Sequence, residues 1–218
     1  IHSEAHPVFA PREVYRDSGS FPEDQSDTGA PENASDDAMY SKFRADNADR
    51  AGMVYVGGND GFLHAFDAES GEEKWAYAPS AVHTRLFNTT IPNWTYESFV
   101  DLTPTTRDVY FVETGTGWRT LLVGGMRHGG QLYYGIDVTE HPGDSPTAAA
   151  IGAKVLWEFS DADDADMGYS YGEPYIARFH APHSDDGSAG SANWGVFVGN
   201  GYNSTEPDGN IGSGNAVL

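Results

Sequence analysis

The stretch MVYVGGNDGFLHAFDAESGEEKWAYAP, Met53–Pro79, decides the fold. Its β-rich runs and turn signals predict three consecutive antiparallel strands, at Met53–Gly58, Phe62–Asp67 and Lys74–Ala78. Asp60-Gly61 marks the first hairpin turn, because glycine adopts the positive φ that such turns require. Ser70-Gly71 marks the second turn. The segment is therefore expected to form a β-meander.

The theme of this meander recurs twice further along the chain. Val54–Gly58 aligns with Leu121–Gly125 and again with Val196–Asn200, each a β-rich run ending in a glycine-containing turn. The copies start about 70 residues apart, which exceeds the ~40–50 residues of one propeller blade. Insertions are therefore expected between them, at Ala81–Thr106 and His141–Gly152.

Aspartate and tryptophan occupy matching places after the first two copies. The candidate structural motif consists of Asp67, Gly71 and Trp75 in the first copy. Asp137 and Trp157 occupy the equivalent positions of Asp67 and Trp75 in the second copy. An aspartate at a strand end can accept hydrogen bonds from the backbone of the following turn, and a tryptophan can fill the gap between sheets. We interpret these residues as structural. For the tryptophans, stacking on a ligand is the alternative.

A single meander has two apolar faces that it cannot bury alone, and radial stacking of successive meanders solves this problem. The spacing A-x-D-x-x-x-G-x-x-x-W, from Ala65 to Trp75, resembles the repeat of quinoprotein-type β-propellers. The predicted fold is therefore all-β and quinoprotein-like. Closed propellers have ~4–8 blades. About three are expected here, an incomplete propeller with long loop insertions that is completed by further sequence.

Two regions of the chain differ in composition. Residues 1–50 are expected to be a lead-in, with an acidic, turn-rich exposed loop at Ser18–Asp37. Within the lead-in, Val8–Tyr15 is a candidate strand and Ala38–Ala51 a candidate helical turn. Residues 51–218 are expected to hold the partial propeller.

The charge balance excludes some partners. The chain has 33 acidic and 12 basic residues, a net charge of −21, which disfavours contact with nucleic acid. This acidity suits either a saline habitat or an ordinary acidic extracellular surface. The chain has no cysteine, so disulfides and thiolate metal sites are excluded. No apolar run approaches the ~20 residues of a transmembrane segment.

The densest acidic cluster is a weak candidate metal site. It consists of Asp161, Asp163, Asp164 and Asp166. Ca²⁺ prefers several oxygen ligands, but an EF-hand needs glycine at its sixth position and glutamate at its twelfth. Asp166 and Gly172 stand there instead, so a solvated surface loop is the alternative. His180 and His183 could similarly belong to a zinc site or to a hairpin tip.

Taken in order, these motifs resemble the C-terminal propeller of the PilC/PilY family of type IV pilus biogenesis factors and tip-associated adhesins. The matching segments are Val54–Ser80, Phe99–Phe111, Trp118–Thr139, Val155–Arg178 and Trp194–Ser204. The resemblance implies a non-enzymatic interaction scaffold, extracellular at the pilus tip or cell surface, that acts in pilus assembly, retraction control and adhesion. The implied partners are minor pilins, other assembly proteins, and a host or abiotic surface. The family's calcium loop, of the D-x-D-x-D-G type, is absent from this sequence, so calcium is expected only in the full-length family protein.

Two other functions are compatible with a propeller repeat. The first is a fragment of a pyrroloquinoline-quinone-type dehydrogenase, whose cofactor usually lies near a vicinal cysteine pair. That pair is missing here. The second is a generic assembly scaffold of the outer membrane.

Overall fold

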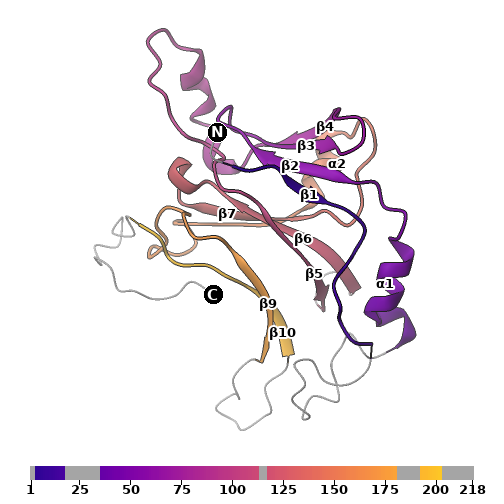
Figure 1. Ribbon diagram of the computed structural model, residues 1–218. Coiled ribbons are helices and arrows are strands. Elements are labelled where there is room, and N and C mark those ends of the chain that lie inside the picture. The colour runs from indigo at the N-terminus through magenta and orange to yellow at the C-terminus, as the bar shows by residue number, and fades with distance from the viewer. Residues whose placement is uncertain (1–2, 18–34, 113–116, 181–191, 203–218) are drawn as a thin grey trace.

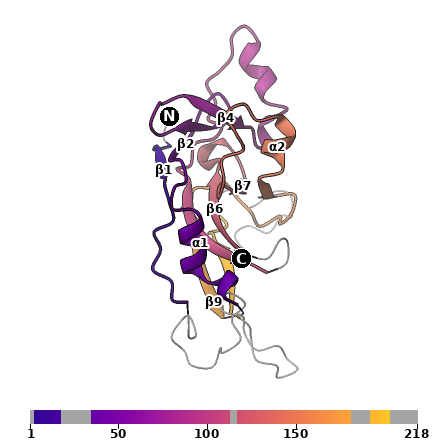
Figure 2. The same ribbon diagram turned by 90° about the vertical axis from the view of Figure 1, so that its right-hand side faces the viewer.

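The computed structural model describes residues 3–17, 35–112, 117–180 and 192–202, and in these ranges the fold is dominated by antiparallel sheets. The first sheet has the order β1 (His6–Val8), β2 (Met53–Gly57), β3 (Leu63–Asp67) and β4 (Glu73–Tyr77). The second has the order β5 (Thr105–Phe111), β6 (Gly117–Gly125), β7 (Leu132–Asp137) and β8 (Val155–Ser160). A third, two-stranded sheet pairs β9 (Tyr175–His180) with β10 (Ala192–Phe197). The sheets follow one another through the molecule, as Figures 1 and 2 show.

Among the residues that the structure describes, helical structure is confined to short segments between strands. They are η2 (Asp36–Ala38), α1 (Tyr40–Asp46), η3 (Ser80–Val82), η4 (Leu86–Thr90), η5 (Arg127–Gly129) and α2 (Ala148–Gly152). The predicted all-β class is therefore confirmed. None of the helices in the described ranges is both long enough and apolar enough to span a bilayer.

The predicted meander is present as β2, β3 and β4. Gly61 has a φ of +99° and Gly71 a φ of +72°, so both turns use the left-handed conformation that favours glycine. Gly58 N–H donates to the Phe62 carbonyl at 2.8 Å, and Gly71 N–H donates to the Asp67 carbonyl at 2.9 Å. Both hairpin turns are thus closed by the residues that the sequence indicated.

The first two sheets repeat the same strand register. Ala65 pairs with Tyr55 and Trp75, and the pairing shifts immediately after Ala65. Gly135 pairs with Val123 and Trp157, and the same shift follows it. A Cβ on Gly135 would lie 2.3 Å from the Trp157 ring, so glycine leaves room for that indole.

This register corrects the sequence alignment of the two copies by one residue. Gly57 ends its pairing opposite Leu63, and Gly125 ends its pairing opposite Tyr133. Gly57 therefore corresponds to Gly125 in the structure. An alignment of the Val-Gly-Gly sequence in the two copies would instead pair Gly57 with Gly124. The strand register determines which residues of the two copies correspond, because a one-residue slip would turn every side chain of the strand to the opposite face.

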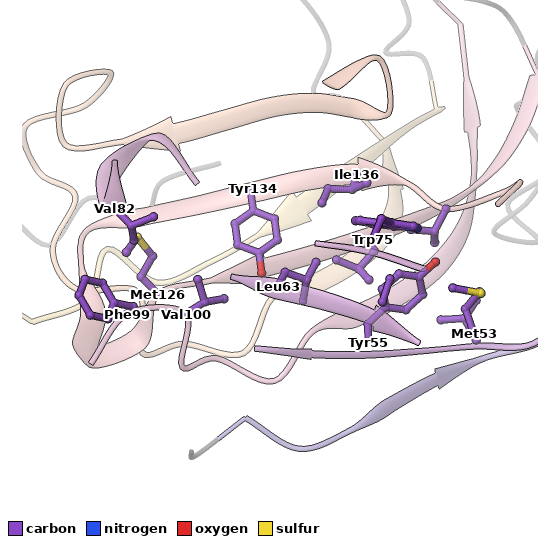
Figure 3. Close-up of a cluster of buried hydrophobic side chains, with 14 of the residues drawn as sticks. Met53, Tyr55, Leu63, Trp75, Val82, Phe99, Val100, Met126, Tyr134 and Ile136 are labelled. Carbon is purple, nitrogen blue, oxygen red and sulfur yellow. The ribbon is translucent and has the colours of Figure 1, made fainter. Parts of the chain in front are cut away.

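The main core lies between the first and second sheets (Figure 3). Tyr55, Leu63 and Trp75 come from the first sheet, and Leu122, Tyr134 and Ile136 from the second. The connecting segments add Val82, Phe99, Val100 and Met126, which gather at one end of the cluster in Figure 3. This face-to-face burial joins the two sheets into one body.

A second apolar cluster lies between the second and third sheets. Its buried members are Val109, Leu121, Val123 and Ile176, with Trp157 and Val196 packed against them. Strand β6 therefore buries both of its faces, with Leu122 in the first cluster and its neighbours in the second. This position in the middle of the stack explains why β6 is apolar at successive positions.

The lead-in contacts both larger sheets. The predicted strand at Val8–Tyr15 is wrong in its bounds: β1 comprises His6–Val8, and beyond it Val14 is 89% exposed. The helical turn predicted within Ala38–Ala51 is present as α1. Residues 18–34 of the acidic loop lie outside the described ranges, so its exposure and the division of the chain at residue 50 stay predictions.

A buried polar network fastens α1 to the second sheet. The Tyr40 hydroxyl donates to Asp108 Oδ2 at 2.6 Å, and the Thr120 hydroxyl donates to Asp108 Oδ1 at 2.6 Å. Trp118 Nε1 donates to the Ala38 carbonyl at 2.8 Å. Burial, together with the hydrogen bond to Asp108, raises the pKa of Tyr40 above its ordinary value. The two hydroxyls compensate the cost of burying the Asp108 carboxylate.

Candidate functional site

The long loops of the first two sheets meet at one end of the strands. The segment from β4 to β5 passes over the turn of its own sheet, where Val100 N–H donates to the Gly58 carbonyl at 3.3 Å. The segment from β8 to β9 does the same, with Ser170 N–H donating to the Gly130 carbonyl at 3.2 Å. We call this the crossover end of the molecule.

The β4–β5 segment is anchored at its base. Val82 and Phe99, near its two ends, are fully buried in the core between the sheets. The Arg85 guanidinium donates to Glu97 Oε2 at 3.0 and 3.2 Å and also to the Gly129 carbonyl, and it lies 4.8 Å from the centre of the Phe99 ring. Arg85 thus ties both ends of the segment to the β6–β7 turn.

Beyond this base, residues 86–97 form a projecting lobe. Figures 1 and 2 both show the part that contains η4 extending away from the sheets. Three large apolar side chains of the lobe are exposed: Phe87 at 72%, Ile91 at 44% and Tyr96 at 59%. The Trp94 ring packs edge-on against Tyr96, with centroids 6.0 Å apart. Apolar groups gathered on a projecting element are typical of an interaction site.

A cavity of about 510 Å³ opens beside the base of the lobe. It is lined by Ser80, Ala81, Arg85, residues 128–132, Ser160, Asp161 and Tyr169. These residues come from the β4–β5, β6–β7 and β8–β9 connections and from the adjoining ends of β7 and β8. The cavity therefore lies where the loops of the first two sheets meet.

The residues of the predicted blade motif lie away from the lobe. Asp67 Oδ1 accepts hydrogen bonds from Ser70 N–H at 2.7 Å and Glu69 N–H at 3.1 Å, and Asp137 Oδ1 accepts from Thr139 N–H at 2.9 Å. The bonds from the Ser70 amide and hydroxyl hold the pKa of Asp67 below its ordinary value. Both aspartates are thus bonded within the turns that follow β3 and β7, at the opposite end from the crossover loops.

The motif tryptophans belong to successive interfaces. Trp75 is 6% exposed in the cluster between the first and second sheets. Trp157 is half-buried against the cluster between the second and third sheets. Each of the two tryptophans therefore packs at a different interface between sheets.

The acidic residues at 161–166 do not converge on one point. Asp163 Oδ2 accepts from Ser160 N–H at 2.9 Å, and Asp164 Oδ1 accepts from Asp166 N–H at 3.0 Å. In the described ranges, no three His, Cys, Asp or Glu side chains form a group that could hold a metal ion. Calcium binding stays a prediction. His183 and the side chain of His180 lie outside the described residues.

Neither the cavity nor the anchor at Arg85 is predictable from the sequence. Arg85 and Gly129 are 44 positions apart, and His128 and Tyr171 are 43 positions apart. No periodic pattern connects such pairs. The tyrosines of Met167–Tyr171 were the one available signal, because exposed aromatic residues in a loop often mark a contact surface.

His64, on β3, forms an ionic cluster with two carboxylates. Its Nδ1 lies 2.8 Å from Glu73 Oε1, and its Nε2 lies 2.9 Å from Asp60 Oδ2. Burial lowers the pKa of His64, but the hydrogen bonds to Glu73 and Asp60 outweigh it, so the pKa is raised above 6.5. The charged imidazole is therefore stabilised in the folded protein.

We expect this cluster to give pH-dependent stability. A raised pKa in the folded state contributes stability that is fully present below 6.5 and is lost as the pH rises through the folded pKa. His64→Gln should therefore lower the melting temperature more at pH 5.5 than at pH 8.5. These two pH values lie roughly one unit below and two units above an ordinary histidine pKa. Thermal unfolding at both pH values measures the difference. An equal decrease at the two pH values would contradict the assignment.

Comparison with known proteins identifies the family. The sequence profile of the PilY1 beta-propeller domain matches residues 29–217. The type IV pilus biogenesis factor PilY1 of Pseudomonas aeruginosa (strain UCBPP-PA14) is 35% identical over 168 residues, which cover 76% of this chain and 13% of that protein. A PilY1 homolog of Xylella fastidiosa (strain Temecula1) is 36% identical over 168 residues, covering 77% of this chain and 12% of that protein.

A solved structure agrees with these matches. The crystal structure of the Pseudomonas aeruginosa PilY1 C-terminal domain aligns with a TM-score of 0.54 and 35% identity, covering 75% of this chain and 27% of that one. This chain spans 12–13% of the length of these two curated relatives. The predicted propeller fold and the resemblance to pilus biogenesis factors are confirmed, and these relatives give the dehydrogenase alternative no support. The chain belongs to the PilY1 β-propeller domain family.

Proposed function

We propose that this chain is a non-enzymatic interaction scaffold of the type IV pilus machinery, which acts in pilus assembly, retraction control and tip-associated adhesion. Its proposed location is extracellular, at the cell surface or the pilus tip. The names of the relatives, type IV pilus biogenesis factors, support the role in the pilus. The proposed partners are minor pilins.

The projecting lobe carries this proposal. Phe87 and Tyr96 expose 72% and 59% of their surface on an element whose base is fixed by Arg85 and by buried side chains. A rigid framework that presents exposed aromatic residues has the anatomy of a binding hot spot, because little conformational freedom is lost when a partner docks. Minor pilins are therefore proposed to contact the lobe.

Replacement of both Phe87 and Tyr96 by serine tests the proposal. The dissociation constant for purified minor pilins should rise about 30-fold, as a loss of ~2 kcal/mol at a hot spot implies. Surface piliation of cells that carry the variant should decrease. Val14→Ser is the matched control, since Val14 is 89% exposed but lies in the lead-in. Unchanged affinity and unchanged piliation in the lobe variant would contradict the proposal.

A further inference from the structure

The cavity beside the base of the lobe is bordered by a set of aromatic rings. The Tyr169 ring neighbours those of His128 and Tyr202, with centroids 6.1 and 6.4 Å away and interplanar angles of 22° and 21°. Tyr171 meets Tyr169 edge-on at 6.3 Å. Rings in contact lie ~3.5–4 Å apart, so centroids more than 6 Å apart mean that the rings are offset and part of each face is left uncovered.

These rings are also accessible from outside. Tyr171 is 41% exposed and Tyr202 is 73% exposed. His128 and Tyr169 line the cavity itself. An aromatic platform therefore runs from the surface into the cavity.

The polar groups of the cavity are held in place by the protein. Gln131 Nε2 donates to the Met167 carbonyl at 2.7 Å, which fixes the side-chain amide. His128 Nδ1 lies 2.6 Å from the Tyr171 hydroxyl, which fixes the imidazole ring. Asp161, an exposed residue, also lines the cavity, and its backbone N–H donates to the Gln131 carbonyl at 3.3 Å. Preorganised donors and acceptors beside aromatic rings are typical of a ligand site.

The charges of the lining disfavour an anion. The Arg85 guanidinium is paired with the Glu97 carboxylate, so Asp161 and the net charge of −21 leave the site acidic. A volume of about 510 Å³ falls within the ~300–1,000 Å³ of small-molecule sites. A sugar satisfies all of these conditions, because its C–H face packs on an aromatic ring while its hydroxyls donate and accept hydrogen bonds.

We propose that this cavity binds a neutral carbohydrate, a hexose or N-acetylhexosamine unit of a glycan. The sugar ring packs against Tyr169, and its hydroxyls bond to Asp161 and Gln131. The site is separate from the projecting lobe, so it adds a glycan-binding activity to the proposed scaffold.

The test uses the whole protein that contains this chain. A glycan array identifies the preferred sugar, and saturation-transfer NMR with its methyl glycoside measures the affinity. Tyr169→Ala and Asp161→Asn should each raise the dissociation constant at least tenfold. The matched controls are Tyr175→Ala and Glu140→Gln, because neither residue lines the cavity and Tyr175 is 64% exposed. Both controls should bind like the parent protein.

Three outcomes would overturn the proposal. They are the absence of binding to any neutral glycan on the array, parental affinity in both cavity variants, and binding of choline, a quaternary ammonium probe, in preference to sugars. If Tyr169→Ala does not fold, as judged by circular dichroism, Asp161→Asn decides the matter. That variant keeps the size of an exposed side chain and removes only its charge.

Discussion

Replacement of Trp75 by alanine is expected to lower the free energy of unfolding by about 3–5 kcal/mol. Trp75 is 6% exposed and pairs with Ala65 on the neighbouring strand. Its ring centroid lies 5.7 Å from that of Tyr55. Its removal leaves a cavity in the core between the first and second sheets. Equilibrium urea unfolding measures the loss.

Two further variants show whether this loss comes from packing. Trp75 Nε1 has no hydrogen-bond partner among the described residues, so the indole contributes through apolar contact alone. Trp75→Phe should therefore cost clearly less than Trp75→Ala. Tyr202→Ala, at a ring that is 73% exposed, should change stability by less than about 0.5 kcal/mol. A Trp75→Ala variant as stable as the parent would refute a structural role for this tryptophan.

Gly129→Ala is expected to destabilise the protein by about 3 kcal/mol. A Cβ at Gly129 would lie 1.8 Å from the Phe99 carbonyl oxygen, which is backbone and cannot rotate away. The chain would have to move where the lobe base meets the β6–β7 turn, and the bond from Arg85 to the Gly129 carbonyl would move with it. Thermal and urea unfolding report the change.

Gly152→Ala is the matched control for this substitution. A Cβ at Gly152 meets nothing within 4 Å, and the residue lies in α2, where alanine is favoured over glycine by up to ~1 kcal/mol. The control should therefore be as stable as the parent or slightly more stable. If Gly129→Ala were equally harmless, the close approach at the lobe base would be wrong.

The framework can be predicted from the sequence because its signals are local. Gly61 and Gly71 mark their turns within a few residues of the strands that they connect. The exact correspondence of the copies cannot be predicted this way. The equivalence of Gly57 and Gly125 can be recognised only when the pairing of Trp157 with Gly135 is known. That pairing depends on the length of the loop between β7 and β8, which varies between the copies.

The contacts at the crossover end cannot be predicted from the sequence for a different reason. Arg85 meets Gly129, and His128 meets Tyr171, through contacts between loops of different strands. Such contacts follow from the stacking of sheets and leave no periodic trace. The lobe can be predicted as an insertion from the sequence. Its base and its exposed face depend on which of its apolar side chains are buried in the core: Phe99 is buried, whereas Phe87 is exposed.

A double-mutant cycle between Tyr77 and Tyr134 tests most directly whether the first and second sheets pack face to face. Tyr77 on β4 and Tyr134 on β7 place their ring centroids 5.2 Å apart in an edge-on arrangement. Replacing each by leucine, singly and together, should give a coupling energy of about 1 kcal/mol in urea unfolding. Strictly additive losses would mean that the two rings do not touch, and would contradict the stacked-sheet arrangement on which the site rests.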